Sequence, residues 1–386
     1  MSKKTTVEKY YQAAAVAKHF GFGVYKSLEV SKEAIQLTKE TKKNTKYFDN
    51  YMPPIEEITE LLLNYKEFEK ENGSIPLFQY FDQPAQGPHT RIRKRPGEEQ
   101  ISLNILGVDN SIAEAILIKT IATILNENGQ KNYTLHLNNI GGKEAKTLFN
   151  REATNFFRKN INLLNANCRQ YFKQGIHTLI TEGGDQCKPL KEQAPEPMDF
   201  LTEETRQIFT NLIERIETFQ IPYEINSDIL GDLNYSDFTN FYFIDNKTGK
   251  ILAAGTRLDL YSKKIGFRKS VPAITANVWI TKPKTISQIL INKIDNCKNY
   301  LLQISPQAKT FALGIIGQLW DNKIFVKHDL TKDRLGPQIQ LSKKYKADNI
   351  IIIGYKESLD LNVMIRDAEG KSQKILEPNE LIDFLK

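Results

Sequence analysis

The sequence contains little cysteine and no long hydrophobic run, and both scarcities exclude classes of protein. Cys168, Cys187 and Cys297 are the only cysteines in 386 residues, and they form no C-x-x-C pair. This spacing argues against a zinc site or a disulfide framework, so we expect three reduced thiols and no bound metal. No apolar run approaches the roughly 18 residues of a membrane-spanning helix. Because the first residues, Met1-Ser-Lys-Lys, lack the apolar stretch of a signal peptide, we expect a cytoplasmic protein without membrane association.

Several common ligand-binding motifs are missing as well. The chain has no G-x-x-x-x-G-K-[ST] loop, no G-x-G-x-x-G fingerprint and no H-E-x-x-H. The remaining composition is that of an ordinary globular protein, with 40% hydrophobic and 26% charged residues, so a sizeable core can be buried. The formal net charge of +7 is a mild indication of a polyanionic partner.

Hydrophobic periodicity predicts strands and helices in the first three quarters of the chain. Residues 101–107 and 133–138 alternate between apolar and polar side chains, which predicts two strands, with His136 a structural residue of the second. Residues 238–260 predict a hairpin, because Asp-Asn-Lys-Thr-Gly at its centre is typical of a turn. We interpret residues 143–175 as helical and residues 183–197, rich in Gly, Gln and Pro, as a linker.

The last 90 residues predict a separate α/β domain. Continuous apolar strands between helices indicate a parallel sheet that is covered on both faces. We place the start of this domain near residue 297, after a body of residues 1–290. The strands are expected at residues 300–304, 323–326, 350–353 and 362–366, and the helices at 307–320, 335–345 and 380–385.

Four segments, taken in order, resemble histidyl-tRNA synthetase: residues 133–145, 193–206, 251–259 and 338–354. The third resembles the family's G-G-R-Y-D motif, and the fourth its anticodon-binding domain. The resemblance covers residues 100–386, whereas residues 1–100 diverge. It implies an α+β fold of the class II aminoacyl-tRNA synthetase type, with a six-stranded antiparallel sheet and flanking helices, then a three-layer α/β anticodon-binding-type domain. It also implies a homodimer that acts in translation on histidine, ATP with Mg, and tRNA.

The resemblance implies that arginines bind the phosphates of ATP, and the sequence does not match them. Charge that develops on phosphoryl oxygens is stabilised by fixed guanidinium groups, which grip phosphate at two points. At motif 3, Lys282 replaces the arginine and keeps its charge but not its planar fork. The motif 2 arginine aligns with Gln86 or with Ile92. Compensation for the missing motif 2 arginine would require a remodelled basic loop that contains Arg91, Arg93, Lys94 and Arg95. This loop is either a solvated turn or a loop between two strands that contacts phosphate or RNA.

The resemblance also implies a histidine pocket, of which only part is matched. The family's histidine-specific arginine has become Gly231, its second tyrosine Ser236, and a pocket glutamate Asn104. A further glutamate-bearing segment survives only as Met-Pro-Pro-Ile at residues 52–55. The matched residues, which the resemblance assigns to a residual amino-acid pocket, are Gln100, Tyr235, Arg257 and Asp259. Gln100 and Tyr235 are otherwise packing residues, and Arg257 and Asp259 are otherwise a pair that holds the fold at a strand end.

Two functions are consistent with this pattern. Because the loss of one preorganised donor typically costs about 3–4 kcal/mol of transition-state stabilisation, the leading hypothesis is a catalytically degenerate paralogue. It would bind tRNA through its C-terminal domain or act as a regulatory subunit on a protein partner, as the synthetase-like subunit of ATP phosphoribosyltransferase does. The alternative is an active histidine–tRNA ligase that forms histidyl-adenylate. Only the alternative requires cofactors, namely ATP and Mg.

Overall fold

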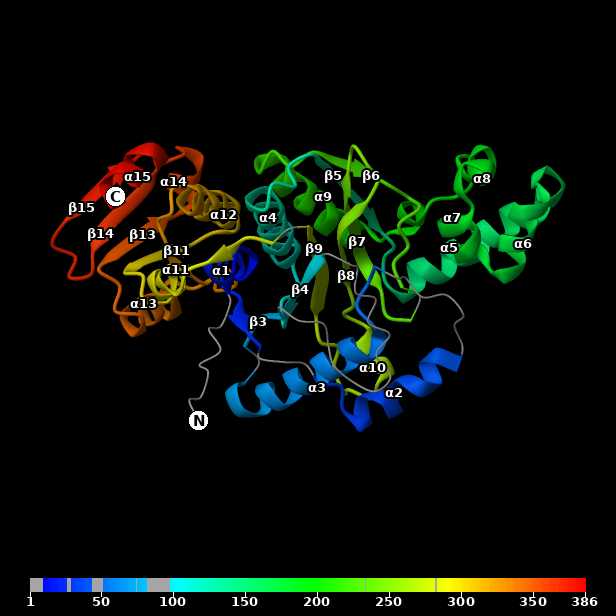
Figure 1. Ribbon diagram of the computed structural model, residues 1–386, viewed down its shortest axis with the longest axis horizontal. Helices are drawn as coiled ribbons and strands as arrows, with labels where there is room; N and C mark the ends of the chain where they lie inside the picture. Colours follow the sequence, from blue (N-terminus) through cyan, green and yellow to red (C-terminus); the bar gives the residue numbers. More distant parts are fainter. Residues whose placement is uncertain are drawn as a thin grey trace, which may run out of the picture.

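The strands of the body form one large sheet, and those of the last 90 residues form a smaller one (Figure 1). The structure is a computed structural model that describes residues 10–25, 29–43, 51–73, 75–81, 98–232, 234–281 and 283–386. The α+β class predicted from the sequence is confirmed, because a largely antiparallel sheet with flanking helices precedes a C-terminal α/β domain.

The large sheet has eight strands, and the six in its centre are antiparallel to their neighbours. The six-stranded antiparallel sheet that the resemblance implies is therefore present, with one short parallel strand added at each edge. In spatial order the strands are β2 (Gly23–Val24), β3 (Leu77–Phe81), β4 (Glu98–Leu106), β9 (Ala273–Thr281), β8 (Ile251–Arg257), β7 (Asp237–Asp245), β5 (Tyr133–Asn139) and β6 (Tyr223–Ile225).

One face of this sheet, here called the helix face, is apolar. Alternate residues of a strand point to opposite faces, and the helix-face residues Ile101, Leu103 and Ile105 of β4 are buried. They join one hydrophobic cluster with residues of α1 (Gln12–His19), α4 (Ile112–Glu127) and α9 (Glu203–Thr218). The N-terminus of α9 is capped by Thr202, whose Oγ1 accepts a hydrogen bond from the backbone N–H of Thr205.

The opposite face, here called the polar face, is covered by helices from the divergent first hundred residues (Figure 1). Ile58 and Leu62 pack there in a cluster with Ala254 and Trp279 of the sheet. The helices on this side are α2 (Lys32–Lys43), α3 (Ile55–Asn72) and the short α10 (Tyr261–Lys264).

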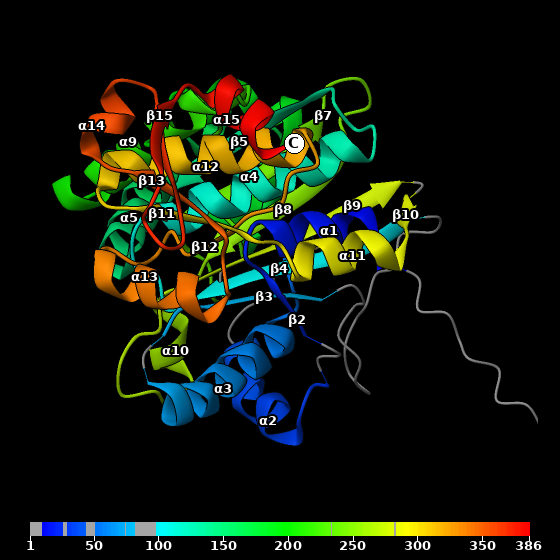
Figure 2. The same cartoon turned by 90° about the vertical axis from the view of Figure 1, so that its left-hand side faces the viewer.

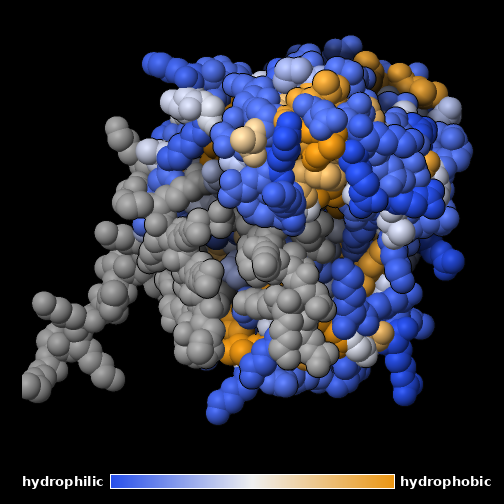
Figure 3. All heavy atoms as spheres, turned by 90° about the vertical axis from the view of Figure 1, so that its right-hand side faces the viewer, coloured by the Kyte–Doolittle hydropathy of each residue, from blue (hydrophilic) through white to orange (hydrophobic). Residues whose placement is uncertain are grey.

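A helical insertion follows β5 and has a hydrophobic core of its own. The predicted linker at residues 183–197 is wrong, because residues 184–191 form a helix that tolerates Pro189. Figure 3 views the end of the molecule with this insertion and shows a mainly hydrophilic surface with small hydrophobic groups. Its helices are α5 (Lys143–Lys159), α6 (Ala166–Gln174), α7 (Ile176–Glu182) and α8 (Gly184–Lys191), with short 3-10 turns at Ile161–Leu163 and Pro197–Phe200.

The expectation of three reduced thiols is also wrong. Cys168 of α6 and Cys187 of α8 form a disulfide, with their Cα atoms 5.9 Å apart, while Cys297 is a free, half-buried thiol. Both paired cysteines belong to the core of the insertion, which brings together positions separated by 19 residues. Their sequence spacing carried no signal of this pairing, because α7 lies between them in the chain.

The C-terminal sheet is parallel in one half and antiparallel in the other. The strand predicted at residues 323–326 is wrong, because the chain turns there at Lys323, which has a positive φ of 59°, and a two-residue strand follows at Lys327–His328. The strands in spatial order are β12 (Lys327–His328), β11 (Asn299–Gln303), β13 (Asn349–Ile353), β14 (Val363–Asp367) and β15 (Gln373–Leu376). Its helices are α12 (Pro306–Asp321), α13 (Leu335–Lys344), α14 (Tyr355–Leu359) and α15 (Pro378–Leu385).

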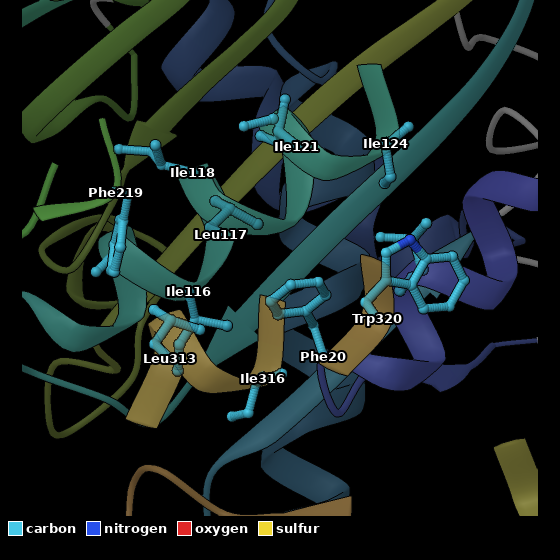
Figure 4. Close-up of a cluster of buried hydrophobic side chains, with 14 of the residues drawn as sticks. Phe20, Ile116, Leu117, Ile118, Ile121, Ile124, Phe219, Leu313, Ile316 and Trp320 are labelled. Carbon is cyan, nitrogen blue, oxygen red and sulfur yellow. The ribbon is translucent and has the colours of Figure 1, made fainter. Parts of the chain in front are cut away.

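The two sheets are joined by α11 (Gln288–Asp295) and by a short ladder between β1 (Tyr10–Tyr11) and β10 (Thr285–Ile286). The C-terminal domain then packs on the body through α12, whose Leu313 lies beside Ile116 of α4 and whose Trp320 lies toward the Ile124 end of the same helix (Figure 4). The indole N–H of Trp320 donates to Glu127, 2.8 Å away. One hydrophobic cluster therefore runs from the helix face of the large sheet into the C-terminal domain.

Candidate ligand-binding face of the large sheet

The polar face carries amides and hydroxyls on four neighbouring central strands. Three side-chain pairs bridge these strands, and all of their members are nearly inaccessible to solvent. Ser102 Oγ donates to Asn277 Oδ1 at 2.6 Å, Thr275 Oγ1 to Asn104 Oδ1 at 2.6 Å, and Thr256 Oγ1 to Asn240 Oδ1 at 2.7 Å. Since buried polar groups are normally hydrogen-bonded, these pairs stabilise a face that would otherwise be costly to bury.

Two amides on this face keep an unpartnered atom. Gln79 and Asn104 stand directly opposite each other on β3 and β4, yet Gln79 Oε1 and Asn104 Nδ2 have no hydrogen-bond partner among the described residues. Strands β3, β4, β7, β8 and β9 place no lysine or arginine on this face, because the single candidate, Arg257, pairs with Ile274 and points to the helix face. The described strands thus offer amides, hydroxyls and the carboxylate of Glu98 but no cation, and these groups do not fit a triphosphate.

The side chain of Tyr235, a predicted pocket residue, is buried and bonds to other residues of the protein. Its side chain is 1% exposed, and its hydroxyl donates to the backbone oxygen of Pro53 at 2.5 Å. Its ring also meets Tyr261 edge-on, with 6.0 Å between centroids. Tyr235 therefore anchors the segment that leads into α3, a segment that comes from the divergent part of the chain.

Gly231, which aligns with the family's histidine-specific arginine, has no room for a side chain. Its φ of +66° is a left-handed conformation that favours glycine. A Cβ atom built there would lie 2.1 Å from Asn240 Oδ1 and 2.5 Å from Ser236 Oγ. Ser236 is itself engaged, because its Oγ accepts from the backbone N–H of Asp232 at 2.8 Å. The loss of the arginine is therefore coupled to the residues around it.

Arg257 and Asp259 form an ion pair at the end of β8. Arg257 Nε lies 2.9 Å from Asp259, its Nη1 lies 2.9 Å from Glu114 of α4, and its Nη2 donates to the backbone oxygen of Val108. Burial alone would lower the pKa of Arg257, but the two carboxylates outweigh burial and raise it. Burial raises the pKa of Asp259 to about 6. The guanidinium is thus committed to bonds inside the protein.

The structure does not bring the four matched residues together. Gln100 faces Trp279 on β9, whereas Arg257 faces Ile274, five positions further along the same strand. The other predicted site residues lie outside the described part of the chain, namely Arg91, Arg93, Lys94, Arg95 and Lys282.

Sequence reasoning missed two features of this region. Glu114, the second carboxylate partner of Arg257, is a lone acidic residue in the otherwise apolar start of α4, and that isolation was an available signal. The polar row was also visible in part, because Ser102 and Asn104 alternate with buried isoleucine and leucine. This alternation indicates a strand, and the amide and hydroxyl within it indicate in addition a face that needs buried hydrogen-bond partners.

A carboxyl group lies buried on the helix that covers the polar face. Glu57 of α3 is 5% exposed, and burial raises its pKa to about 7. The described residues contain no group of three or more His, Cys, Asp or Glu side chains that could hold a metal ion. Within the same residues, no helix is long and apolar enough to cross a membrane.

Comparison with known proteins identifies the scaffold. The anticodon binding domain family matches residues 298–386. The histidine–tRNA ligase of Listeria innocua is 23% identical over 317 residues, which cover 80% of this chain and 73% of that protein. The chain is a member of the histidyl-tRNA synthetase family.

Two solved structures from the histidyl-tRNA synthetase family are also similar to this chain. Apo histidyl-tRNA synthetase from S. aureus is 16% identical, with a TM-score of 0.49 and coverage of 97% of this chain and 93% of that one. An ATP phosphoribosyltransferase regulatory subunit/histidyl-tRNA synthetase from Bacillus halodurans is 12% identical, with a TM-score of 0.45 and coverage of 89% and 92%.

Proposed function

We propose that this member of the histidyl-tRNA synthetase family is catalytically degenerate and acts by binding RNA through its C-terminal domain. The observation that carries the proposal is Gly231. A residue that should grip the substrate histidine is replaced by one whose backbone conformation and neighbours exclude any side chain. We also expect the chain to be a cytoplasmic homodimer, as the family implies.

The internal contacts of the other predicted pocket residues support the loss of catalysis. Tyr235 and Arg257 are bonded to Pro53 and Glu114, so neither is available to a substrate without breaking a buried contact. The polar face offers amides, hydroxyls and the carboxylate of Glu98 on its described strands, whereas a triphosphate calls for cations. The groups that the described strands place on this face therefore do not fit the phosphates of ATP, and we assign no step to it.

Exposed cations on the C-terminal domain support the RNA role. Lys343, Lys344, Tyr345 and Lys346 lie at the end of α13, and all four are exposed. None of the three lysines takes part in an ion pair among the described residues. Lysines with an interleaved aromatic ring suit a phosphate backbone with an unstacked base. The segment lies inside the region matched by the anticodon binding domain family.

ATP–pyrophosphate exchange with the full chain tests the loss of catalysis. We expect no exchange that depends on histidine, while the Listeria innocua ligase, assayed in parallel, exchanges readily. Histidine-dependent exchange would refute the proposed loss of catalysis and establish the active-ligase alternative.

Filter binding with tRNA tests the RNA role. We expect binding that weakens at least tenfold between about 50 and 200 mM salt, because counterions are released when phosphates are neutralised. The variant K343E/K344E/K346E should bind at least tenfold more weakly, whereas K131E/K247E/K293E, which reverses three exposed lysines of the body, should bind like wild type. An absence of salt-sensitive binding would leave a protein partner as the ligand.

A further inference from the structure

A second group of cations gathers on the body, far in sequence from the C-terminal domain. We define the body basic cluster as Lys143 and Lys146 at the start of α5 together with Lys263, Lys264, Arg268 and Lys269 in and after α10. Four of the seven residues between positions 263 and 269 are basic, and all four are exposed. The cluster uses positions that no part of the histidine pocket requires.

The charges in this cluster repel one another. Partial burial lowers the pKa of Lys264, and the nearby ammonium group of Lys146 lowers it further, with a smaller effect from Lys143. Asp237 and Asp232 oppose these effects, but Asp237 is already paired with Lys146, and Asp232 accepts two hydrogen bonds from Asn234. Like charges held this closely without enough acidic partners produce a positive potential that attracts anions.

The outer half of the cluster is free to meet a ligand. Among the described residues, Lys263, Arg268 and Lys269 take part in no ion pair, and no hydrogen bond from their side chains is found. Beside them, Lys66 of α3 lies over the ring of Phe267, with its Nζ 4.8 Å from the ring centroid. Phe267 is half-buried and packs on the body, so the surface offers charge without an apolar group to insert into a membrane.

The helices α10 and α13, which carry or precede much of the cluster and the C-terminal lysines, lie on the same side of the molecule (Figure 2). In Figure 2, α10 and α13 lie along the same border of the structure, while Figure 1 shows them well separated along the long axis. A single extended polyanion could therefore contact both, whereas a small phosphate ligand could not. The phosphates of RNA repeat along its backbone, which matches two basic surfaces set apart on one side.

We propose that the body basic cluster is a second RNA-binding surface, which contacts the phosphate backbone of the RNA held by the C-terminal domain. This inference rests on the proposed function, since it assumes that the C-terminal domain binds RNA. Contact with phosphates carries no sequence information of its own, so this surface fixes the orientation of the RNA on the body.

The test compares charge-reversal variants in filter binding with tRNA over a series of salt concentrations. K263E/R268E/K269E leaves untouched Lys146, which pairs with Asp237, and Lys264, which donates to the backbone oxygen of Asn234. We expect its affinity at about 50 mM salt to fall ten- to a hundredfold and the slope of log affinity against log salt to decrease by about 2, at somewhat less than one unit per lost phosphate contact. The variant K131E/K247E/K293E is the matched control and should keep the wild-type slope.

The outcomes separate this inference from the proposed function. If wild type binds no RNA, the proposed function fails. A different result refutes only the second surface. In that case wild type binds RNA and K343E/K344E/K346E binds more weakly, but K263E/R268E/K269E keeps the wild-type affinity and slope. Circular dichroism and thermal unfolding show whether each variant is folded. If the charge reversal does not fold, K263Q/R268Q/K269Q replaces it, and because it removes the same three phosphate contacts it should give a similar change in slope with a smaller loss of affinity.

Discussion

The two faces of the large sheet have the same strands but different kinds of contact. On the helix face, Leu103 and its neighbours pack into a hydrophobic cluster that continues through α4 into the C-terminal domain. On the polar face, Asn104 and Thr275 bond to each other beneath α3, a helix from the divergent part of the chain. The helix face is held together by apolar packing, whereas the polar groups of the polar face bond mainly to one another.

The two faces depend on their residues in different ways. Apolar packing is spread over many residues, so it tolerates substitution if volume and pattern are kept. A ligand site depends on a few groups, and each group that is lost can be replaced by a bond inside the protein. Tyr235 and Arg257 illustrate the second case, because both are matched to the family and both are committed to internal partners.

The largest effect should come from breaking the ion pair that ties β8 to the helix face. Arg257→Met leaves Glu114, whose side chain is 2% exposed, without its cation. Removing one partner of a buried pair strands the other charge, so we expect the free energy of unfolding to fall by about 3–5 kcal/mol. Urea denaturation followed by circular dichroism measures it.

Two further variants control this experiment. Arg151→Met removes an exposed ion pair with Glu152 and should change stability by no more than about 0.5 kcal/mol. R257M/E114L removes both charges and should regain part of the loss. A cost below about 1 kcal/mol for R257M alone would mean that the pair does not hold this end of the sheet.

The next effect concerns packing on the helix face. Leu103→Ala deletes a fully buried side chain in the middle of β4. Lost transfer energy and the remaining cavity should lower the free energy of unfolding by about 2–5 kcal/mol. Ile208→Ala on α9, which is 36% exposed, should cost much less. Equal losses from both variants would contradict the view that the helix face carries the stability of the scaffold.

The sequence pattern predicted the strands well because alternation depends only on residues that are close together in the chain. Alternation at residues 133–138 and the turn within 238–260 identified strands that the structure contains, since one buried face imposes a period of two. The pairing of Cys168 with Cys187 and the two-residue strand at Lys327 could not be foreseen, because each depends on packing between distant segments.

The sequence names candidate site positions, but it does not reveal what surrounds them. The sequence predicts that Gly231 stands in place of an arginine, whereas the exclusion of any side chain there follows from Asn240 and Ser236, which reach it from β7 and the loop before it. Likewise, Tyr235 matches the family, but its bond to Pro53 spans 182 positions.

A carboxyl group beneath the polar face should make stability depend on pH. Burial raises the pKa of Glu57 to about 7, so the folded protein binds this proton more tightly than the unfolded chain does. Its favourable contribution is complete below about pH 4.5 and is lost as the pH rises through about 7. The free energy of unfolding of Glu57→Gln, relative to that of wild type, should therefore increase by about 2–3 kcal/mol as the pH rises through that range.

Thermal unfolding at pH 4.5 and pH 8 measures this gain. Glu67→Gln, on the same helix but 68% exposed and paired with Lys70, is the matched control and should show almost no pH-dependent difference from wild type. If E57Q and wild type keep the same difference in stability at both pH values, Glu57 does not titrate as a buried group.

The smallest effect should come from the polar pair itself. Thr275→Val alone leaves Asn104 without any hydrogen-bond partner, since Asn104 Nδ2 already lacks one, and should cost about 1–2 kcal/mol. N104L/T275V replaces both polar groups with apolar ones, and because no buried group is then left unpaired, stability should return to within about 1 kcal/mol of wild type. The double variant should also bind tRNA like wild type, because the described RNA-binding candidates lie elsewhere. A double variant that stays folded but loses tRNA binding would show that the polar face still serves a ligand, and the contrast between the two faces would then have to be redrawn.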